Sequence, residues 1–278
     1  MKMRKKMIRL FCSDFDNTLA RKRKIPEAHI EAIHRLQRAG VDFVLVTGRA
    51  PQNACAILEK YSIRCHCIGF NGSAGVERDG RQIFEIPMDL DALRDLLADC
   101  RTHGEFFLLY GNGRCYIPKI FGFFSWIKGM ISRKVNMRIE YLERDLSNFI
   151  HDGGTAYKLN RYPGRRMQDL KNALLKDDRI SVTASSHRQM EVSAAGVSKW
   201  NGILSLSAVL GISPDEIAAI GDYENDLSMI RNAGIGFSMG NGSEELKAAA
   251  DFIVGDVKNA GLAEAADIIL RYNDNEEK

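Results

Sequence analysis

Short apolar runs that read as buried strands alternate with helical patterns at the start of this chain. Strands are expected at 8–13 and 41–46, on either side of a helical pattern at 26–39 that opens with a proline. A second helical pattern near 51–61 and a short strand near residue 67 follow. This alternation is typical of a parallel sheet covered by helices on both faces. We therefore expect a Rossmann-like α/β core.

The alternation is interrupted once and then resumes. The interrupting segment has helices, strands and hairpin signals, including a Gly-Asn-Gly turn at 111–113 between two apolar runs. Afterwards the first pattern returns with an expected strand at 189–193. The sequence thus predicts a core domain made of 1–86 and 189–278, split by an inserted α+β cap domain at 87–188.

Composition excludes several classes of protein. The net charge of +3 over 278 residues is too small to indicate binding to nucleic acid or to an anionic membrane. The basic start lacks the apolar stretch of a signal peptide, and no run approaches the ~18 apolar residues of a membrane helix. The six cysteines fall in strand and helix patterns, and Cys65-His66-Cys67 lacks the second ligand pair of a zinc site. We expect a cytoplasmic protein.

Four short motifs follow predicted strands or open a helix, where an open α/β sheet binds its ligands. Each has a plain structural explanation when taken alone: a solvated strand end, a strand-to-helix turn, a solvated lysine and a helix cap. The four are Asp14-Phe15-Asp16-Asn17-Thr18, Thr47-Gly48-Arg49, Lys199 after Ser198, and Gly221-Asp222-Tyr223-Glu224-Asn225-Asp226.

Some of these residues also suit an anion or a cation. Asn17 tolerates the left-handed backbone that would turn two carboxylates, Asp14 and Asp16, toward one place. Lys199 in a first helical turn opposes the helix dipole, which a nearby anion would offset. Asp222 and Asp226 lie one helical turn apart and could face one cation.

The set, in this order, resembles the haloacid dehalogenase superfamily of aspartate-nucleophile phosphatases and, within it, the Cof-type branch. The resemblance runs from Asp14 to about Gly261, and the insertion matches the position of that branch's type IIB cap, which selects the substrate. It implies a Mg²⁺-dependent phosphatase that hydrolyses small phosphorylated metabolites, such as sugar phosphates or phosphorylated cofactors, through an aspartyl-phosphate.

The resemblance also implies roles for individual residues. Asp14 would be the nucleophile and Asp16 the general acid and base. Thr47 and Lys199 would hold the phosphoryl oxygens and offset their charge, with Gly48 and Arg49 beside them. The remaining positions would bind Mg²⁺, through Asp14, the Asp16 backbone carbonyl, Asp222 and Asp226, or line the site, as at Asn71 and Asn225.

Two positions depart from the family's pattern. Asn17 stands where glycine is commonest, although asparagine keeps the turn. Trp200 stands where a small residue usually follows the lysine, which leaves the packing around Lys199 open.

The same sequence pattern is compatible with other functions. A phosphorylated receiver domain shares the acidic cluster, threonine and lysine but lacks an insertion of this size. A catalytically idle relative that binds phospho-ligands need not keep Asp16. Phosphoryl transfer between sugar positions, as in phosphomannomutases, stays closer to the pattern and differs in needing an acceptor sugar.

The insertion carries two further expectations. Residues 81–190 hold 18 Lys/Arg against 13 Asp/Glu, whereas the rest holds 21 against 23, so a basic cap would suit a phosphorylated anion. The aromatic-rich stretch 120–131 is expected to be either the cap's own core or an exposed apolar patch that closes over the site or forms a homodimer through the cap.

Overall fold

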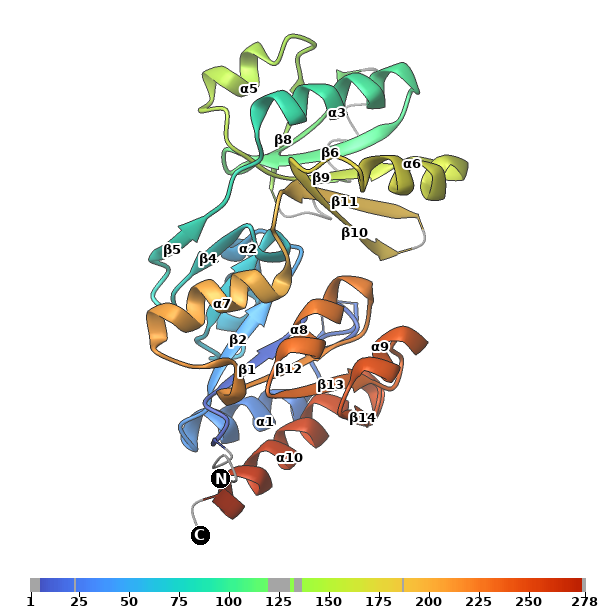
Figure 1. Cartoon of the computed structure of the whole chain (residues 1–278). Coiled ribbons are helices and arrows are strands. Elements are labelled where there is room, and N and C mark those ends of the chain that lie inside the picture. The colour runs from blue at the N-terminus through green and yellow to red at the C-terminus, as the bar shows by residue number, and fades with distance from the viewer. Residues whose placement is uncertain (1–5, 23, 120–130, 133–136, 187, 277–278) are drawn as a thin grey trace. The chain divides into compact units, whose positions relative to one another are not determined.

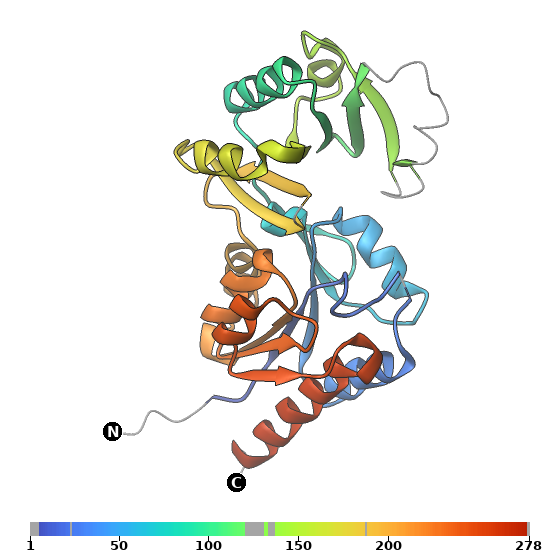
Figure 2. The same cartoon turned by 90° about the vertical axis from the view of Figure 1, so that its right-hand side faces the viewer.

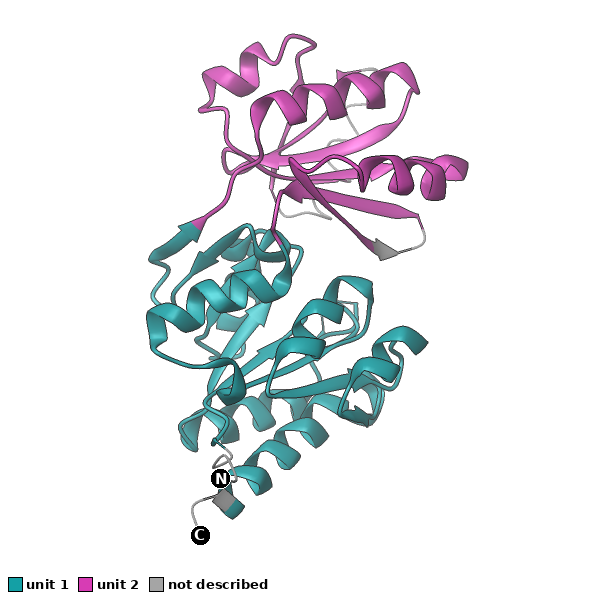
Figure 3. Ribbon diagram, viewed as in Figure 1, with its two compact units in different colours: residues 1–84, 198–278 teal, residues 85–197 magenta. Residues whose placement is uncertain are grey.

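A computed structural model describes the chain at residues 6–22, 24–119, 131–132, 137–186 and 188–276 (Figure 1). It divides into two compact units, which Figure 3 shows in two colours. The first unit comprises 1–84 and 198–278, and the second comprises 85–197. The aromatic-rich stretch lies outside the described residues at 120–130, so the lid, core and homodimer hypotheses remain predictions.

An eight-stranded sheet forms the centre of the first unit. The strands from β14 to β3 in the spatial order are parallel, and β3 then pairs with β4 in the antiparallel sense. Strand β1 lies in the middle, and the chain builds the sheet outward from it on both sides. In spatial order the strands are β14 (Phe252–Val254), β13 (Ile235–Met239), β12 (Ile217–Gly221), β1 (Leu10–Ser13), β2 (Asp42–Val46), β3 (His66–Gly69), β4 (Ala74–Val76) and β5 (Gln82–Glu85).

Helices cover both faces of this sheet, so its central strands are apolar on both sides (Figures 1 and 2). Along β1, Phe11 packs into one buried cluster and Cys12 into the other. The expected Rossmann-like core is thereby confirmed. The helices and 3-10 turns of this unit are α1 (Glu27–Arg38), α2 (Pro51–Glu59), η1 (Phe70–Gly72), α7 (Lys199–Leu210), η4 (Pro214–Glu216), η5 (Glu224–Asp226), α8 (Leu227–Asn232), α9 (Glu244–Ala249), η6 (Val257–Asn259) and α10 (Gly261–Glu276).

The second unit has its own six-stranded sheet and its own hydrophobic cluster. Its pairings are antiparallel except between β7 and β8, and the expected hairpin at the 111–113 turn joins β6 to β7. In spatial order the strands are β10 (Ile180–Ser186), β11 (Gln189–Ala194), β9 (Ala156–Tyr162), β6 (Phe106–Gly111), β7 (Arg114–Pro118) and β8 (Arg138–Leu142), with helices α3 (Leu90–Thr102), α5 (Ser147–His151) and α6 (Met167–Leu174) and the 3-10 turn η3 (Gly164–Arg166).

The position of β11 corrects one expectation. The sequence pattern predicts a return to the first domain at residue 189, but β11 pairs with β10 and β9 in the second sheet. Its apolar side chains, Met190 and Val192, pack into the second unit's cluster. The second unit therefore extends to residue 197 rather than to 188.

Helices of the described part of the chain are nowhere both long enough and apolar enough to cross a lipid bilayer.

Candidate active site

Polar residues follow three neighbouring parallel strands at one edge of the first unit's sheet. Asp14 comes directly after β1, Thr47 after β2 and Asp222 after β12. Because β1 pairs with both β2 and β12 in parallel, the carboxyl ends of these strands lie side by side. Strand order also reverses at β1, and this is where open α/β sheets bind ligands.

Three buried carboxylates and one buried ammonium meet at this edge. Lys199 Nζ, in the first turn of α7, donates to Asp14 Oδ1 at 2.6 Å and to Asp226 Oδ1 at 2.5 Å. Asp14, Asp222 and Asp226 each offer an oxygen, and these atoms lie within 4.8 Å of one another. Lys199 is only 1% exposed, so the solvated-lysine alternative is wrong.

The charges perturb one another because little water reaches them. Burial raises the pKa of Asp14 well above its usual range, and the carboxylates of Asp226 and Asp222 add to this while Lys199 opposes it. Burial and the charge of Asp226 raise the pKa of Asp222 to about 7. Burial lowers the pKa of Lys199, but Asp14 and Asp226 outweigh burial and raise it. The site favours protons or a cation among its carboxylates.

Backbone contacts fix the Asp222–Asp226 segment. Asp226 Oδ2 accepts hydrogen bonds from the backbone amides of Asp222 at 2.9 Å and Tyr223 at 3.0 Å. A Cβ atom at Gly221 would lie 2.4 Å from Asp226 Cγ, so a larger residue there would displace this carboxylate. The 3-10 turn η5 thus directs Asp226 back toward the strand end, beside Lys199.

Asp16 lies apart from the three clustered carboxylates. Its two oxygens accept from Arg49 Nε at 3.0 Å and Arg49 Nη2 at 2.7 Å, in a bidentate pair. The Arg49 guanidinium lies over the Phe15 ring at 4.8 Å from its centroid. The Asp16 side chain is 57% exposed, so its carboxylate is open to solvent. Among the expected metal-binding residues, it is the one whose carboxylate does not join the cluster.

Asn17 provides the turn that separates the two aspartates. Its φ of 63° is in the left-handed region, as expected for asparagine, and its backbone amide donates to the Ala20 carbonyl at 2.8 Å. The chain therefore turns away directly after Asp16, which explains why Asp14 and Asp16 differ so much in burial.

Thr47 and Asn71 are joined through the backbone. The Asn71 amide donates to the Thr47 carbonyl at 3.0 Å, and the Arg49 amide donates to Thr47 Oγ1 at 3.2 Å across Gly48. Asn71 has a φ of 59°, and its Oδ1 accepts from Asn225 Nδ2 at 3.4 Å. The structure thus links the two expected asparagines, one after β3 and one after β12.

Two residues of the site were not predicted. Thr18 Oγ1 donates to Asp222 Oδ1 at 3.0 Å and is fully buried. Asn241 Nδ2 lies 3.4 Å from Asp222 Oδ2 and 3.2 Å from the Asn17 carbonyl. A hydroxyl inside an acidic motif was a usable signal for Thr18. Asn241 follows β13, and only strand order places that loop beside β12.

Trp200 packs away from the charges. It is 8% exposed and belongs to the cluster formed by α7 and one face of the sheet. The unusual bulk beside Lys199 is therefore accommodated by the core of the first unit.

The cluster fits a hard divalent cation. Carboxylate oxygens are the ligands that Mg²⁺ prefers, and three carboxylates with one ammonium leave an excess of two negative charges. A divalent cation would balance that excess. Asp14, Asp222 and Asp226 are the residues that could hold it.

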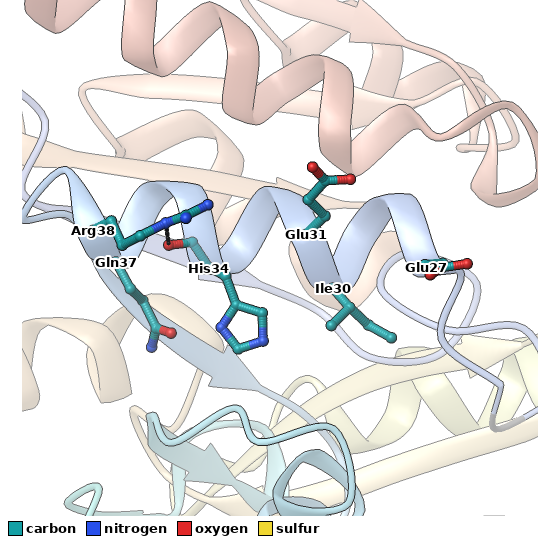
Figure 4. A pocket seen from close by; sticks show the side chains of 6 residues that line it. All are labelled: Glu27, Ile30, Glu31, His34, Gln37 and Arg38. Carbon is teal, nitrogen blue, oxygen red and sulfur yellow. Dashed lines mark hydrogen bonds between the residues drawn. The ribbon is translucent and has the colours of Figure 1, made fainter.

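A separate pocket of about 680 Å³ lies along α1 and includes none of these residues (Figure 4). Ile30 and His34 share its lining with charged side chains of the same helix. It contributes nothing to the acidic cluster.

Comparisons with known proteins show the family to which the chain belongs. The chain matches the haloacid dehalogenase-like hydrolase family over residues 11–265. It is 25% identical over 264 residues to the 5-amino-6-(5-phospho-D-ribitylamino)uracil phosphatase YcsE of Bacillus subtilis, covering 93% of this chain and 94% of that protein. It is 28% identical over 283 residues to the chloroplastic endoribonuclease YBEY of Arabidopsis thaliana, covering 95% of this chain but only 46% of that longer protein.

The fold is similar to a solved structure of a subclass IIB sugar phosphatase. The TM-score is 0.79 at 21% identity, covering 94% of this chain and 98% of that one. The expected resemblance to a Cof-type chain with a type IIB insertion is thereby confirmed at the level of fold.

Proposed function

Because the chain belongs to the haloacid dehalogenase-like hydrolase family, we propose that it is a Mg²⁺-dependent phosphatase of small phosphorylated metabolites with Asp14 as the nucleophile. One observation carries this proposal. A buried carboxylate at a sheet edge is held 2.6 Å from a buried ammonium, beside two further carboxylates. That arrangement combines a nucleophile with the positive charge that a phosphoryl group requires.

The first half of the reaction would transfer the phosphoryl group to the protein. Lys199 binds Asp14 Oδ1, so the attack on phosphorus falls to Oδ2. A bond forms between this oxygen and phosphorus while the ester bond to the leaving oxygen breaks. Asp16 would first exchange one of its two hydrogen bonds with Arg49 for a proton, and would then give that proton to the leaving oxygen. Lys199 and Thr47 offset and hold the charge on the phosphoryl oxygens.

The second half would return the protein to its starting state. Asp16 accepts a proton from water, whose oxygen attacks phosphorus and displaces the Asp14 carboxylate. Inorganic phosphate leaves, and Asp14 and protonated Asp16 are restored. A Mg²⁺ held by Asp14, the Asp16 backbone carbonyl and Asp222, with support from Asp226, would offset the repulsion between carboxylate and phosphate.

Two observations support a small phosphorylated substrate. The Bacillus subtilis relative is named for a phosphorylated ribitylaminouracil. The inserted segment has more basic than acidic residues, which suits an anion. We propose the same broad class, phosphate monoesters of sugars or of cofactor precursors, for this chain.

The test measures inorganic phosphate released from a panel of phosphorylated metabolites in the presence of Mg²⁺. Asp14→Asn should lose roughly a thousandfold or more of the rate, because an amide is neither a nucleophile nor a good Mg²⁺ ligand. Asp42→Asn is the matched control, since Asp42 opens β2 and pairs with Arg78 away from the cluster. A tenth of the wild-type rate remaining in Asp14→Asn would contradict the proposed nucleophile.

A further inference from the structure

A cavity of about 360 Å³ lies entirely within the second unit. Its lining residues come from the end of α3, from β6, and from the ends of β7 and β8 with the residues that follow them. Helix α3 packs on one face of the sheet that contains these strands (Figure 1). The volume is near the lower end of the range for small-molecule sites, roughly 300–1,000 Å³. A ligand of this cavity would therefore be small.

The floor of this cavity is apolar. Phe107, Pro118 and Leu142 line it, and all three side chains are buried. Phe107 and Leu142 also belong to the hydrophobic cluster of the second unit, so packing in that core fixes their positions. An apolar group of a ligand would thus rest on a surface that is already formed before binding.

The rim of the cavity is basic. Arg101 and Thr102 are the last two residues of α3, Lys119 directly follows β7, and Arg144 lies two residues after β8. Three cations and one hydroxyl are the polar side chains of the lining. No Asp or Glu is among the described residues that line the cavity. A ligand at this rim would meet positive charge from three separate elements.

Glu143 brings the rim together but neutralises only part of its charge. Lys119 Nζ donates to both carboxylate oxygens of Glu143 at 3.0 Å. Arg101 Nη2 reaches only the Glu143 backbone carbonyl, at 3.5 Å. Arg144 is the next residue, and within the described part of the chain its side chain has no hydrogen bond or ion pair. Two guanidinium groups therefore keep most of their donors available for an anion.

We propose that this cavity binds a small organic anion, in which a ring carries a phosphate or carboxylate group. The ring rests on the apolar floor, and Arg101 and Arg144 hold the charged group. A guanidinium matches either charged group, because its planar fork donates two parallel hydrogen bonds. None of the lining residues belongs to the acidic cluster, so this is a second binding site, and its ligand need not be the substrate.

The experiment titrates phenylphosphonate and benzoate into the full-length protein by calorimetry in EDTA. Neither probe is a phosphate ester, and the metal-free acidic cluster repels anions. One molecule of at least one probe should bind per chain, and the two affinities show which charged group is preferred. Methylphosphonate and acetate should bind at least about tenfold more weakly, since they leave the apolar floor uncovered. Absence of binding, or equal affinity for probes with and without a ring, would overturn the proposal.

Changes of charge at the rim test where the probe binds. Arg144→Gln should weaken binding by about tenfold or more, since a hydrogen-bonded charge is lost. Arg94→Gln is the matched control, because Arg94 also lies on α3 but pairs with Asp91 and does not line the cavity. Thr102→Glu should abolish binding by repulsion, whereas Thr102→Gln, which is similar in size but neutral, should bind as wild type within a few-fold.

Binding at the acidic cluster of the first unit is the alternative that these variants must exclude. Lys199→Met removes the ammonium of that cluster and should leave the affinity for the ring probes unchanged. Loss of binding in Lys199→Met, with normal binding in Arg144→Gln, would place the probe in the first unit and contradict the proposal. Thr102 is exposed, so the Thr102 pair decides the question even if Lys199→Met does not fold. Equal affinities of Thr102→Glu and Thr102→Gln would also exclude this cavity.

Discussion

The ionised carboxylates of Asp14, Asp222 and Asp226 outnumber the single ammonium of Lys199 at a place that water hardly reaches. Protein without a bound cation can relieve this excess only by keeping protons on carboxyl groups that would otherwise release them. Protons and metal ions therefore compete for the same carboxylate oxygens.

This competition predicts an unusual pH dependence of stability. Asp222 has a pKa of about 7 when folded and an ordinary value of 3.8, so between these values the folded protein holds a proton that the unfolded chain has released. The free energy of unfolding of metal-free protein should therefore fall as pH rises from 4 to 7, by at most about 1.4 kcal/mol per pH unit for one group. Melting temperatures measured in EDTA across this range test it.

Two variants and the addition of Mg²⁺ test whether Asp222 causes this pH dependence. Asp222→Asn should make the fall in melting temperature shallower, whereas Asp42→Asn should leave it unchanged. Mg²⁺ should raise the melting temperature more at pH 8 than at pH 5, since it binds the ionised carboxylates. A wild-type profile that coincides with that of Asp222→Asn would exclude Asp222 as the titrating group.

For Asp16, which is exposed and paired with Arg49, the prediction concerns the rate of hydrolysis and not stability. Asp16→Ala should slow hydrolysis of alkyl phosphates by roughly a hundredfold or more, the usual contribution of a general acid. Hydrolysis of p-nitrophenyl phosphate should slow much less, since its leaving group needs little protonation. The ratio of the two rates is the measurement, and equal losses on both substrates would remove the acid role.

At the scale of elements, the site depends on how closely η1 approaches the start of α7. Gly72 has a φ of 112°, and a Cβ there would lie 2.1 Å from the Ser198 carbonyl oxygen. Ser198 caps α7 by accepting from the Asn201 amide at 3.1 Å, and Lys199 follows directly. The glycine thus allows the contact that sets where Lys199 begins its helix.

Gly72→Ala should therefore damage both stability and rate. The strained backbone costs about 1–3 kcal/mol, and relief of the clash moves the first turn of α7 and with it Lys199. Gly80→Ala is the matched control, because Gly80 has a φ of 87° but nothing within 4 Å of a Cβ. Denaturant unfolding and phosphate release are measured together. If the two variants lose the same stability and rate, the close approach is unimportant.

The elements also show where sequence reasoning succeeds. Asp14, Thr47 and Asp222 each directly follow an apolar parallel strand, which is a position that a local sequence pattern can predict. The ion pair between Lys199 and Asp226 follows from tertiary packing, which no local pattern encodes. The prediction that β11 belongs to the first sheet is wrong, although the alternation of Met190 and Val192 with Glu191 is typical of an antiparallel strand.

At the scale of the whole molecule, each unit has its own hydrophobic core: two clusters cover the two faces of the first unit's sheet, and one cluster fills the second unit. The second unit has a complete sheet with helices on its own cluster, and it buries Arg161 against Glu105 at 2.6 Å within itself. Its boundaries at 85 and 197 are set by these contacts rather than by a composition change, so sequence located them only approximately.

Residues 85–197 should consequently fold when expressed alone. Circular dichroism of this fragment should show one cooperative thermal transition, as expected of a domain with its own core. Leu109→Ala, which removes a fully buried side chain from this cluster, should lower stability by about 2–5 kcal/mol. A fragment without a cooperative transition would show that the second unit depends on the first.

The central position of β1 has a consequence for synthesis of the protein. Strand β1 is made first, but its neighbour β12 emerges roughly two hundred residues later, which is about 10–40 s at ribosomal rates of ~5–20 residues per second. Until then one edge of β1 has no partner and Asp14 has neither Lys199 nor Asp226 beside it. The nascent chain must therefore protect an open, apolar sheet edge while the whole second unit is translated and folds.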